Sequence, residues 1–159
     1  LGAASAGDIA TFYGDDYINF EHISVESGDW RFAGTGSFGL LTIDEFARLG
    51  GNGDLNGDLV INGTLAPGNS IGRLTVTGDV VLTSSIIFAA EVNSFGLSDR
   101  LVVDCRITLE LGQLQVQPVV AGTYSARSVS PLMPAPNGLA RALCSLYITA
   151  PLVPSHPTL

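Results

Sequence analysis

The sequence contains no lysine, and charged residues make up only 14% of its 159 residues. Fifteen acidic residues outnumber seven arginines, which gives a net charge of −8. Nucleic-acid binding needs clustered basic side chains to neutralise phosphates, and an anionic membrane surface needs a similar patch. The composition therefore predicts no nucleic-acid partner and no basic membrane-surface patch.

Cysteine and histidine are also scarce, with two of each: Cys105, Cys144, His22 and His156. Two cysteines do not make a disulfide framework; two free thiols are favoured, and one bridge remains the alternative. Zinc needs three or four clustered ligands, and a Ser-His-Asp triad needs a histidine beside a nucleophile. We therefore predict no catalytic, cofactor-binding or metal-binding residues, no cofactor and no enzymatic activity.

Long apolar runs are missing as well. No stretch reaches the roughly 18 apolar residues of a membrane helix, and residues 1–7 lack the basic and apolar regions of a signal peptide. If the protein is exported, we expect this chain to be a mature piece or a fragment of it.

What the chain does contain is a repeated strand-and-corner pattern. Asp58, Asp79 and Asp99 are spaced by 21 and 20 residues, and each precedes an apolar run of Leu-Val-Ile, Val-Val-Leu or Leu-Val-Val. A period of about 20 residues with one strand set per repeat is typical of a solenoid. The alternating segments 73–77 and 86–92 support strands, and only residues 43–49 weakly suggest a helix.

A sandwich or barrel is the main alternative, because it also has regularly spaced strands. The similar corners favour stacked parallel coils, whereas Asn62-Gly63 is a hairpin-type dipeptide that favours the sandwich. Glycine, Asn, Asp and Ser at the corners suit tight turns. We predict an all-β, single-stranded parallel β-helix.

The last third of the chain has a different composition. All fifteen acids lie at or before Glu110, whereas six of eight prolines lie at or after Pro131. Such a break marks a domain boundary or linker. We therefore predict a β-helix over residues 1–124 and an atypical, irregular proline-rich tail over 125–159, either a cap or disordered, in which only 137–150 suits a short helix or strand.

The segment Gly50–Asp58 suggests a calcium loop with Asp54, Asn56 and Asp58 as ligands. Such a loop needs glycine at its sixth position and an acid at its twelfth, where this chain has Leu59 and Leu65. A glycine-rich corner is the favoured interpretation. Asn62-Gly63-Thr64 matches a glycosylation sequon, and a corner is again favoured.

Three further groups of side chains have both a functional and a structural interpretation. Asp58, Asp79 and Asp99 would stack one coil apart, and carboxylates in such a row could hydrolyse a polysaccharide. Aspartates at corners more often cap backbone N–H groups, which is the favoured interpretation. His22 is expected on the outer face of a strand. Aromatic residues near the N-terminus could bind ligands if exposed, although burial in the first coils is favoured: Phe12, Tyr13, Tyr17, Phe20, Trp30, Phe32 and Phe38.

One long stretch resembles a known family. The phrase Asn-Gly-Thr-Leu-Ala-Pro-Gly-Asn-Ser-Ile-Gly-Arg-Leu-Thr-Val-Thr-Gly-Asp at 62–79 is followed by Glu-Val-Asn at 91–93, Ser-Asp-Arg-Leu-Val-Val at 98–103 and Gly-Gln-Leu-Gln-Val at 112–116. Together they resemble the C-terminal passenger region of bacterial autotransporters. The likeness covers roughly residues 17–124, and Leu-Ala-Pro-Gly-Asn-Ser-Ile-Gly at 65–72 is its most specific element.

The resemblance implies a right-handed β-helix on the surface of a Gram-negative bacterium, exported and retained at the outer membrane or secreted. It implies a C-terminal outer-membrane β-barrel in the full-length protein as partner. The sequence departs from the family at Asp104-Cys105-Arg106 and after Tyr124, so a shifted frame or truncation near Ser125 is one hypothesis for the tail.

The expected function is structural: a surface stalk and folding nucleus with no catalysis of its own. Adhesion to a host glycan or protein is a further hypothesis for the same surface. A carbohydrate-active or glycan-binding β-helix protein is the alternative.

Overall fold

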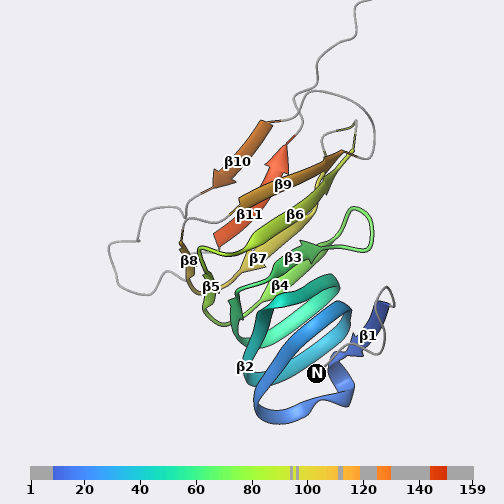
Figure 1. The fold of residues 1–159 in the computed structure, drawn as a ribbon, viewed down its shortest axis with the longest axis vertical. Helices are drawn as coiled ribbons and strands as arrows, with labels where there is room; N and C mark the ends of the chain where they lie inside the picture. Colours follow the sequence, from blue (N-terminus) through green and yellow to red (C-terminus); the bar gives the residue numbers. More distant parts are fainter. Residues whose placement is uncertain are drawn as a thin grey trace, which may run out of the picture.

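The computed structural model describes residues 9–93, 95, 97–110, 113–118, 125–129 and 144–149. Within these ranges the chain is all-β, as the sequence predicts, with one three-residue 3-10 helix (Figure 1). The elements are, in chain order, β1 (Ile9–Tyr13), η1 (Gly14–Asp16), β2 (Ile18–Ile61), β3 (Thr64–Pro67), β4 (Arg73–Val76), β5 (Val80–Leu82), β6 (Ile87–Val92), β7 (Arg100–Val103), β8 (Ile107–Leu109), β9 (Gln113–Pro118), β10 (Ser125–Val129) and β11 (Cys144–Thr149).

Strands β1 to β9 pair in parallel. The long strand β2 lies beside β1, β3, β4 and β5, and three later pairs continue the pattern: β3 with β6, β4 with β7, and β5 with β8. Strand β6 pairs in the same direction with β9. Parallel strands cannot be joined by two-residue hairpins. A sandwich built from hairpins is therefore wrong for this part of the chain, and Asn62-Gly63 is a corner between parallel strands.

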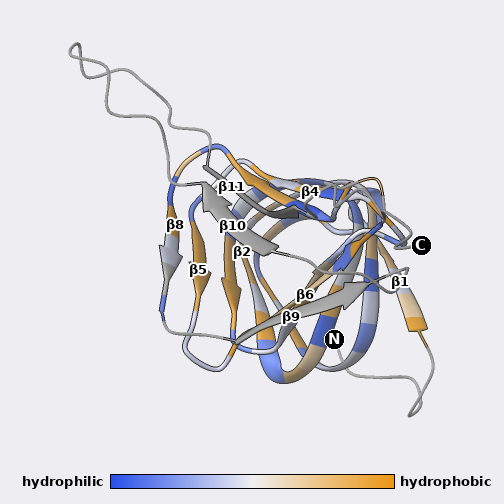
Figure 2. Cartoon of the chain, turned by 90° about the horizontal axis from the view of Figure 1, so that it is seen from above, coloured by the Kyte–Doolittle hydropathy of each residue, from blue (hydrophilic) through white to orange (hydrophobic). Residues whose placement is uncertain are grey.

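The strands surround a common interior, in a sheet nearly closed into a barrel shape (Figure 2). In strands such as β4, β5 and β7 side chains alternate, so that every second residue points inward. Leu74 and Val76 of β4 are buried as their alternation predicts, and so are Ile86, Phe88 and Ala90 around β6. Fully burying one such aliphatic side chain stabilises the fold by roughly 1.5–3 kcal/mol, and this interior is the largest stabilising contribution. Its other members include Val25, Leu41, Ile43, Leu49, Leu55, Leu59, Ile61, Leu65, Val80, Leu82, Val92, Leu101 and Val103.

The spacing between paired residues is not constant along the chain. Arg48 pairs with Thr64, 16 residues later, whereas Leu59 pairs with Val80, 21 residues later. Val80 in turn pairs with Ile107, 27 residues later. The extra residues form the loops around 68–72 and 93–98, which lie outside the strands. A constant 20-residue period, as the sequence suggests, is therefore too simple.

The aromatic side chains near the N-terminus divide between core and surface. Phe12 is fully buried, and its ring centroid lies 4.5 Å from Tyr17 and 5.4 Å from Phe32, both edge-on. Such T-shaped pairs add about 0.5–1.5 kcal/mol beyond burial. By contrast, Tyr13 and Phe20 are more than half exposed. The preference for buried aromatics is thus correct for the phenylalanines at 12, 32 and 38 and wrong for Tyr13 and Phe20.

Two expectations about secondary structure need correction. Residues 43–49 lie in β2 and are not helical, because Leu41, Ile43, Ala47 and Leu49 are buried by packing against neighbouring strands. The tail is not wholly irregular either. Its proline-free segments form β10 and β11, which pair with each other, and β11 also pairs with β7, both in antiparallel fashion. The remaining tail residues, including His156, lie outside the described residues.

Candidate functional site

The corner aspartates Asp58 and Asp79 accept hydrogen bonds from the backbone of later, parallel segments of the chain. Asp58 Oδ1 accepts a hydrogen bond from the backbone N–H of Asp79 at 2.8 Å, and Asp79 Oδ1 accepts one from the N–H of Arg106 at 3.1 Å. Asn52 Oδ1 accepts the N–H of Arg73 in the same way, at 2.8 Å. Both aspartates are exposed. They therefore satisfy donors at corners where the strand ladder is interrupted.

Asp99 does not stack on Asp58 and Asp79, which corrects the hypothesis of three aligned carboxylates. The register places Arg106 above Asp79 and sets Asp99 above Gly72, at a different corner. The cause is the segment between Val80 and Ile107. It is six residues longer than the segment between Leu59 and Val80, so every later residue is displaced from a constant period. No row of three catalytic carboxylates forms from these residues.

Asp99 occupies a buried site of its own. Its Oδ1 accepts the N–H of Gly72 and its Oδ2 accepts the N–H of Glu91, both at 2.8 Å. Only 2% of the residue is exposed. The pKa of Asp99 is raised from 3.8 to about 6. Burial is the main cause and the charge of Glu91 adds to it, whereas the N–H groups of Glu91 and Gly72 and the charge of Arg48 act in the opposite direction.

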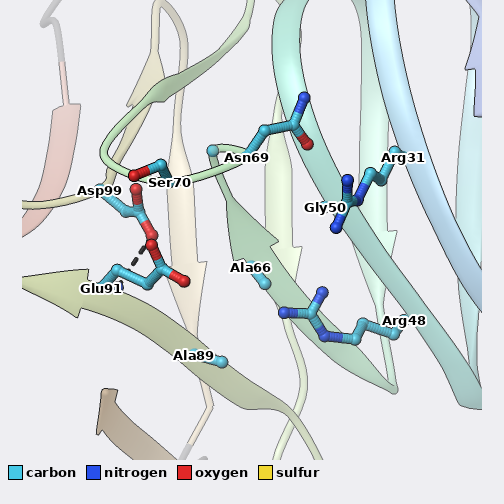
Figure 3. A pocket seen from close by; sticks show the side chains of 10 residues that line it. Arg31, Arg48, Gly50, Ala66, Asn69, Ser70, Ala89, Glu91 and Asp99 are labelled. Atoms are coloured by element: carbon cyan, nitrogen blue, oxygen red, sulfur yellow. Dashed lines mark hydrogen bonds between the residues drawn. The ribbon is translucent and has the colours of Figure 1, made fainter. Parts of the chain in front are cut away.

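Asp99 lines a small polar pocket together with Glu91, Arg31 and Arg48 (Figure 3). Its volume is about 70 Å3. The two arginines project from β2 on one side, and the two carboxylates come from β6 and the segment before β7 on the other. Arg48 also forms an ion pair with Asp29 at 3.6 Å. The pocket thus has a basic end and an acidic end.

Close backbone packing shapes this pocket. Gly68 lies on its wall with a φ of 99°, and it exchanges backbone hydrogen bonds of 3.1 and 2.7 Å with Gly51, whose φ is 104°. Residues other than glycine rarely adopt such angles. A Cβ at Gly68 would collide with Asp99 Oδ1 and with Ser70 O, and one at Gly51 would collide with the backbone of Phe32. Glycine is therefore required at both positions.

The calcium candidates Asp54, Asn56 and Asp58 are spaced along extended β2. Asn56 Oδ1 contacts the Thr77 hydroxyl at 3.4 Å, and Asp58 is bonded to the backbone of the next coil. Among the described residues, no group of three or more His, Cys, Asp or Glu side chains is placed to hold a metal ion.

The remaining candidates have structural partners. His22 is exposed and its Nε2 lies 2.9 Å from Thr42 Oγ1 on the outer face. Asn62 and Gly63 form the corner between β2 and β3, where a Cβ on Gly63 would collide with the carbonyl oxygens of Asp44 and Ala47. Cys105 is a free, exposed thiol that contacts Thr77 O at 3.1 Å.

Two open surface hollows carry exposed aromatic side chains. Phe46 is 81% exposed and lies in a hollow of about 510 Å3 that is also lined by Glu26, Asp44 and Glu45. Phe20 is 51% exposed and lies beside Glu21 in a second hollow of about 390 Å3. Sequence reasoning expected Phe20 to be buried and did not consider Phe46.

Sequence reasoning also missed the arginines of the small pocket. Arg31, Arg48 and Glu91 are far apart in the chain but line the same pocket. They come together because Arg48 of β2 pairs with Thr64 of β3, which in turn pairs with Ile87 of β6. The available signal was the glycine-containing segment 68–72, which lies outside the strands between β3 and β4. Its Gly68, Asn69 and Ser70 line this pocket.

The described part of the chain contains no helix with the length and hydrophobicity needed to cross a membrane. Comparisons with known protein families, with curated proteins and with solved structures each give no match.

Proposed function

We propose that the chain is a segment of a bacterial autotransporter passenger, folded as a right-handed parallel β-helix, that serves as a structural stalk and folding nucleus at the cell surface. The observation that carries this proposal is the parallel pairing of strands β1 to β9, in which paired residues are 16 to 27 positions apart. The second support is the sequence at 62–79, which resembles the passenger region of autotransporters.

The contacts between coils support a mechanical role. Each coil is joined to the next by backbone ladders, by the apolar interior and by corner side chains such as Asp58 and Asp79. Stability of a repeat protein is roughly the sum of its repeats and their interfaces. A stalk built in this way resists local opening, and its terminal coils can act as the template on which further coils fold.

The proposed stalk has two kinds of partner. The first is a C-terminal outer-membrane β-barrel in the full-length protein, and the second is a host glycan or protein bound along the outer face. Localisation at the bacterial cell surface, either anchored or released, follows from the same proposal.

The test is surface exposure on intact cells of the bacterium that carries the gene. Antibodies raised against residues 9–110 should label intact cells, and added protease should remove the label without lysis. Labelling only after the cells are permeabilised would overturn the proposal. Reading the gene downstream gives a second test, since an in-frame outer-membrane barrel is expected there.

The two aromatic hollows favour glycan or protein adhesion as a second candidate function. Their volumes lie within the range of about 300–1,000 Å3 that is typical of ligand sites, and Phe46 and Phe20 offer exposed ring faces. A glycan array tests this: binding that is lost in Phe46→Ala or Phe20→Ala supports adhesion, and no binding to any glycan leaves the stalk as the sole proposal. Release of reducing sugars that persists in Asp79→Asn would exclude that residue as a catalyst.

A further inference from the structure

The small pocket holds four charged groups that face one another without pairing. Arg31 and Arg48 line one end, Glu91 and Asp99 line the other, and none of these four described side chains forms an ion pair within 4 Å with a group across the pocket. The ion pair that Arg48 forms is with Asp29, which does not line the pocket. The charges at the two ends of the pocket are therefore free to bind a small polar molecule between them.

The strands hold the two ends of the pocket apart, and the residues that line the space between the ends have small side chains. Gly50, Ala66, Gly68 and Ala89 line the pocket, and none has a side chain long enough to bridge it. The volume of about 70 Å3 is less than half of the roughly 150 Å3 cavity that holds benzene. The space therefore suits a molecule of only a few heavy atoms, with part of it open to solvent.

The charges determine which small molecule fits. A simple anion drawn to the arginines would be repelled by Glu91 and Asp99, and a simple cation would be repelled by the arginines. Guanidinium groups bind carboxylates through two parallel hydrogen bonds. At the other end, a carboxylate has about four acceptor positions, and Asp99 uses one on each oxygen for the N–H groups of Gly72 and Glu91. Asp99 can therefore still accept hydrogen bonds from an ammonium group.

We propose that this pocket binds a small zwitterion of the α-amino acid type, with its carboxylate at Arg31 and Arg48 and its ammonium group at Glu91 and Asp99. Such a ligand has no net charge and a large dipole, which matches the basic and acidic ends of the pocket. The site is independent of the surface-stalk function, because it requires only the folded chain.

The experiment is a titration of the purified, 15N-labelled chain with glycine, followed by NMR. The backbone amides of Gly72 and Glu91, which bond to Asp99, should shift in a saturable manner. Acetate and methylamine each carry only one of the two charges, and both should bind at least tenfold more weakly than glycine. Lengthening the spacer to β-alanine and γ-aminobutyrate should weaken binding stepwise as the charges move too far apart.

Matched variants locate the site. Arg31→Gln and Glu91→Gln should each weaken glycine binding by at least tenfold, whereas Arg106→Gln and Glu110→Gln change exposed residues that do not line the pocket and should leave it unchanged. Amide spectra of each variant verify that the fold is retained. The absence of saturable glycine shifts, binding of acetate or methylamine equal to that of glycine, or equal loss in the control variants would each overturn the proposal. None of these outcomes affects the surface-exposure test.

Discussion

The corner of Asp58 and Asp79 and the corner of Asp99 use the same bond in opposite surroundings. In each case an aspartate oxygen accepts a backbone N–H from a residue 21 to 27 positions away. Asp58 and Asp79 stand in solvent, whereas Asp99 is almost fully buried. A similar local sequence therefore produces an exposed cap in one place and a buried, charge-lined pocket in the other.

The difference arises from the loops rather than from the aspartates. Between Val80 and Ile107 the repeat is six residues longer than the one before it, and the loop at 68–72 folds over Asp99 through the Gly72 N–H. Burial then makes the carboxylate harder to ionise. Loop insertion is thus the step that turns a structural cap into a candidate binding group.

The largest expected effect comes from removing the buried carboxyl. Asp99→Ala leaves the N–H groups of Gly72 and Glu91 without acceptors, and a buried unsatisfied donor costs roughly 1–3 kcal/mol each. We expect a loss of about 3 kcal/mol in the free energy of unfolding at pH 5, measured by urea denaturation. Asp99→Asn keeps one acceptor oxygen and serves as the control, with about half that loss. Equal stability of wild type and Asp99→Ala would contradict the buried clamp.

The second expected effect is on pH dependence. The folded-state pKa of Asp99 is about 6, above its ordinary value of 3.8, so the folded chain binds this proton more tightly than the unfolded chain does. The contribution of Asp99 to the free energy of unfolding is therefore greatest below pH 4, and it is lost as the pH rises through 6. Relative to Asp99→Asn, the wild type should lose up to about 3 kcal/mol between pH 4 and pH 7. Parallel stability curves for the two proteins, followed by urea denaturation across this range, would show that Asp99 is not buried as described.

Much of the fold could be predicted from the sequence because strand alternation is a local property. The inward positions of Leu74, Val76 and Phe88 follow directly from residue order, and the parallel direction follows from the similarity of the corners. The weak helical pattern at 43–49 failed because packing against neighbouring strands overrides local propensity there.

The pocket could not be predicted because errors in the assumed strand register add up along the chain. Each inserted residue moves every later partner, so a constant 20-residue step placed Asp99 on the wrong corner. Whether Arg31 and Arg48 lie near Glu91 depends on the spacing of each successive pair of strands between them, and no residue type marks this spacing. Charge placement across coils is a tertiary property, whereas burial along a strand is a local one.

The smallest expected effect comes from the exposed corner and completes the comparison. Asp58→Ala removes one acceptor from the Asp79 N–H, but water can replace it because the corner is exposed. We expect a loss of only about 0.5–1 kcal/mol by urea denaturation, and almost none for Asp58→Asn, which keeps an acceptor oxygen. A loss as large as that of Asp99→Ala would mean that the corner bonds, and not burial, determine how much each aspartate stabilises the coils. In that case the distinction between a structural cap and a pocket group would rest on exposure alone, without an energetic counterpart.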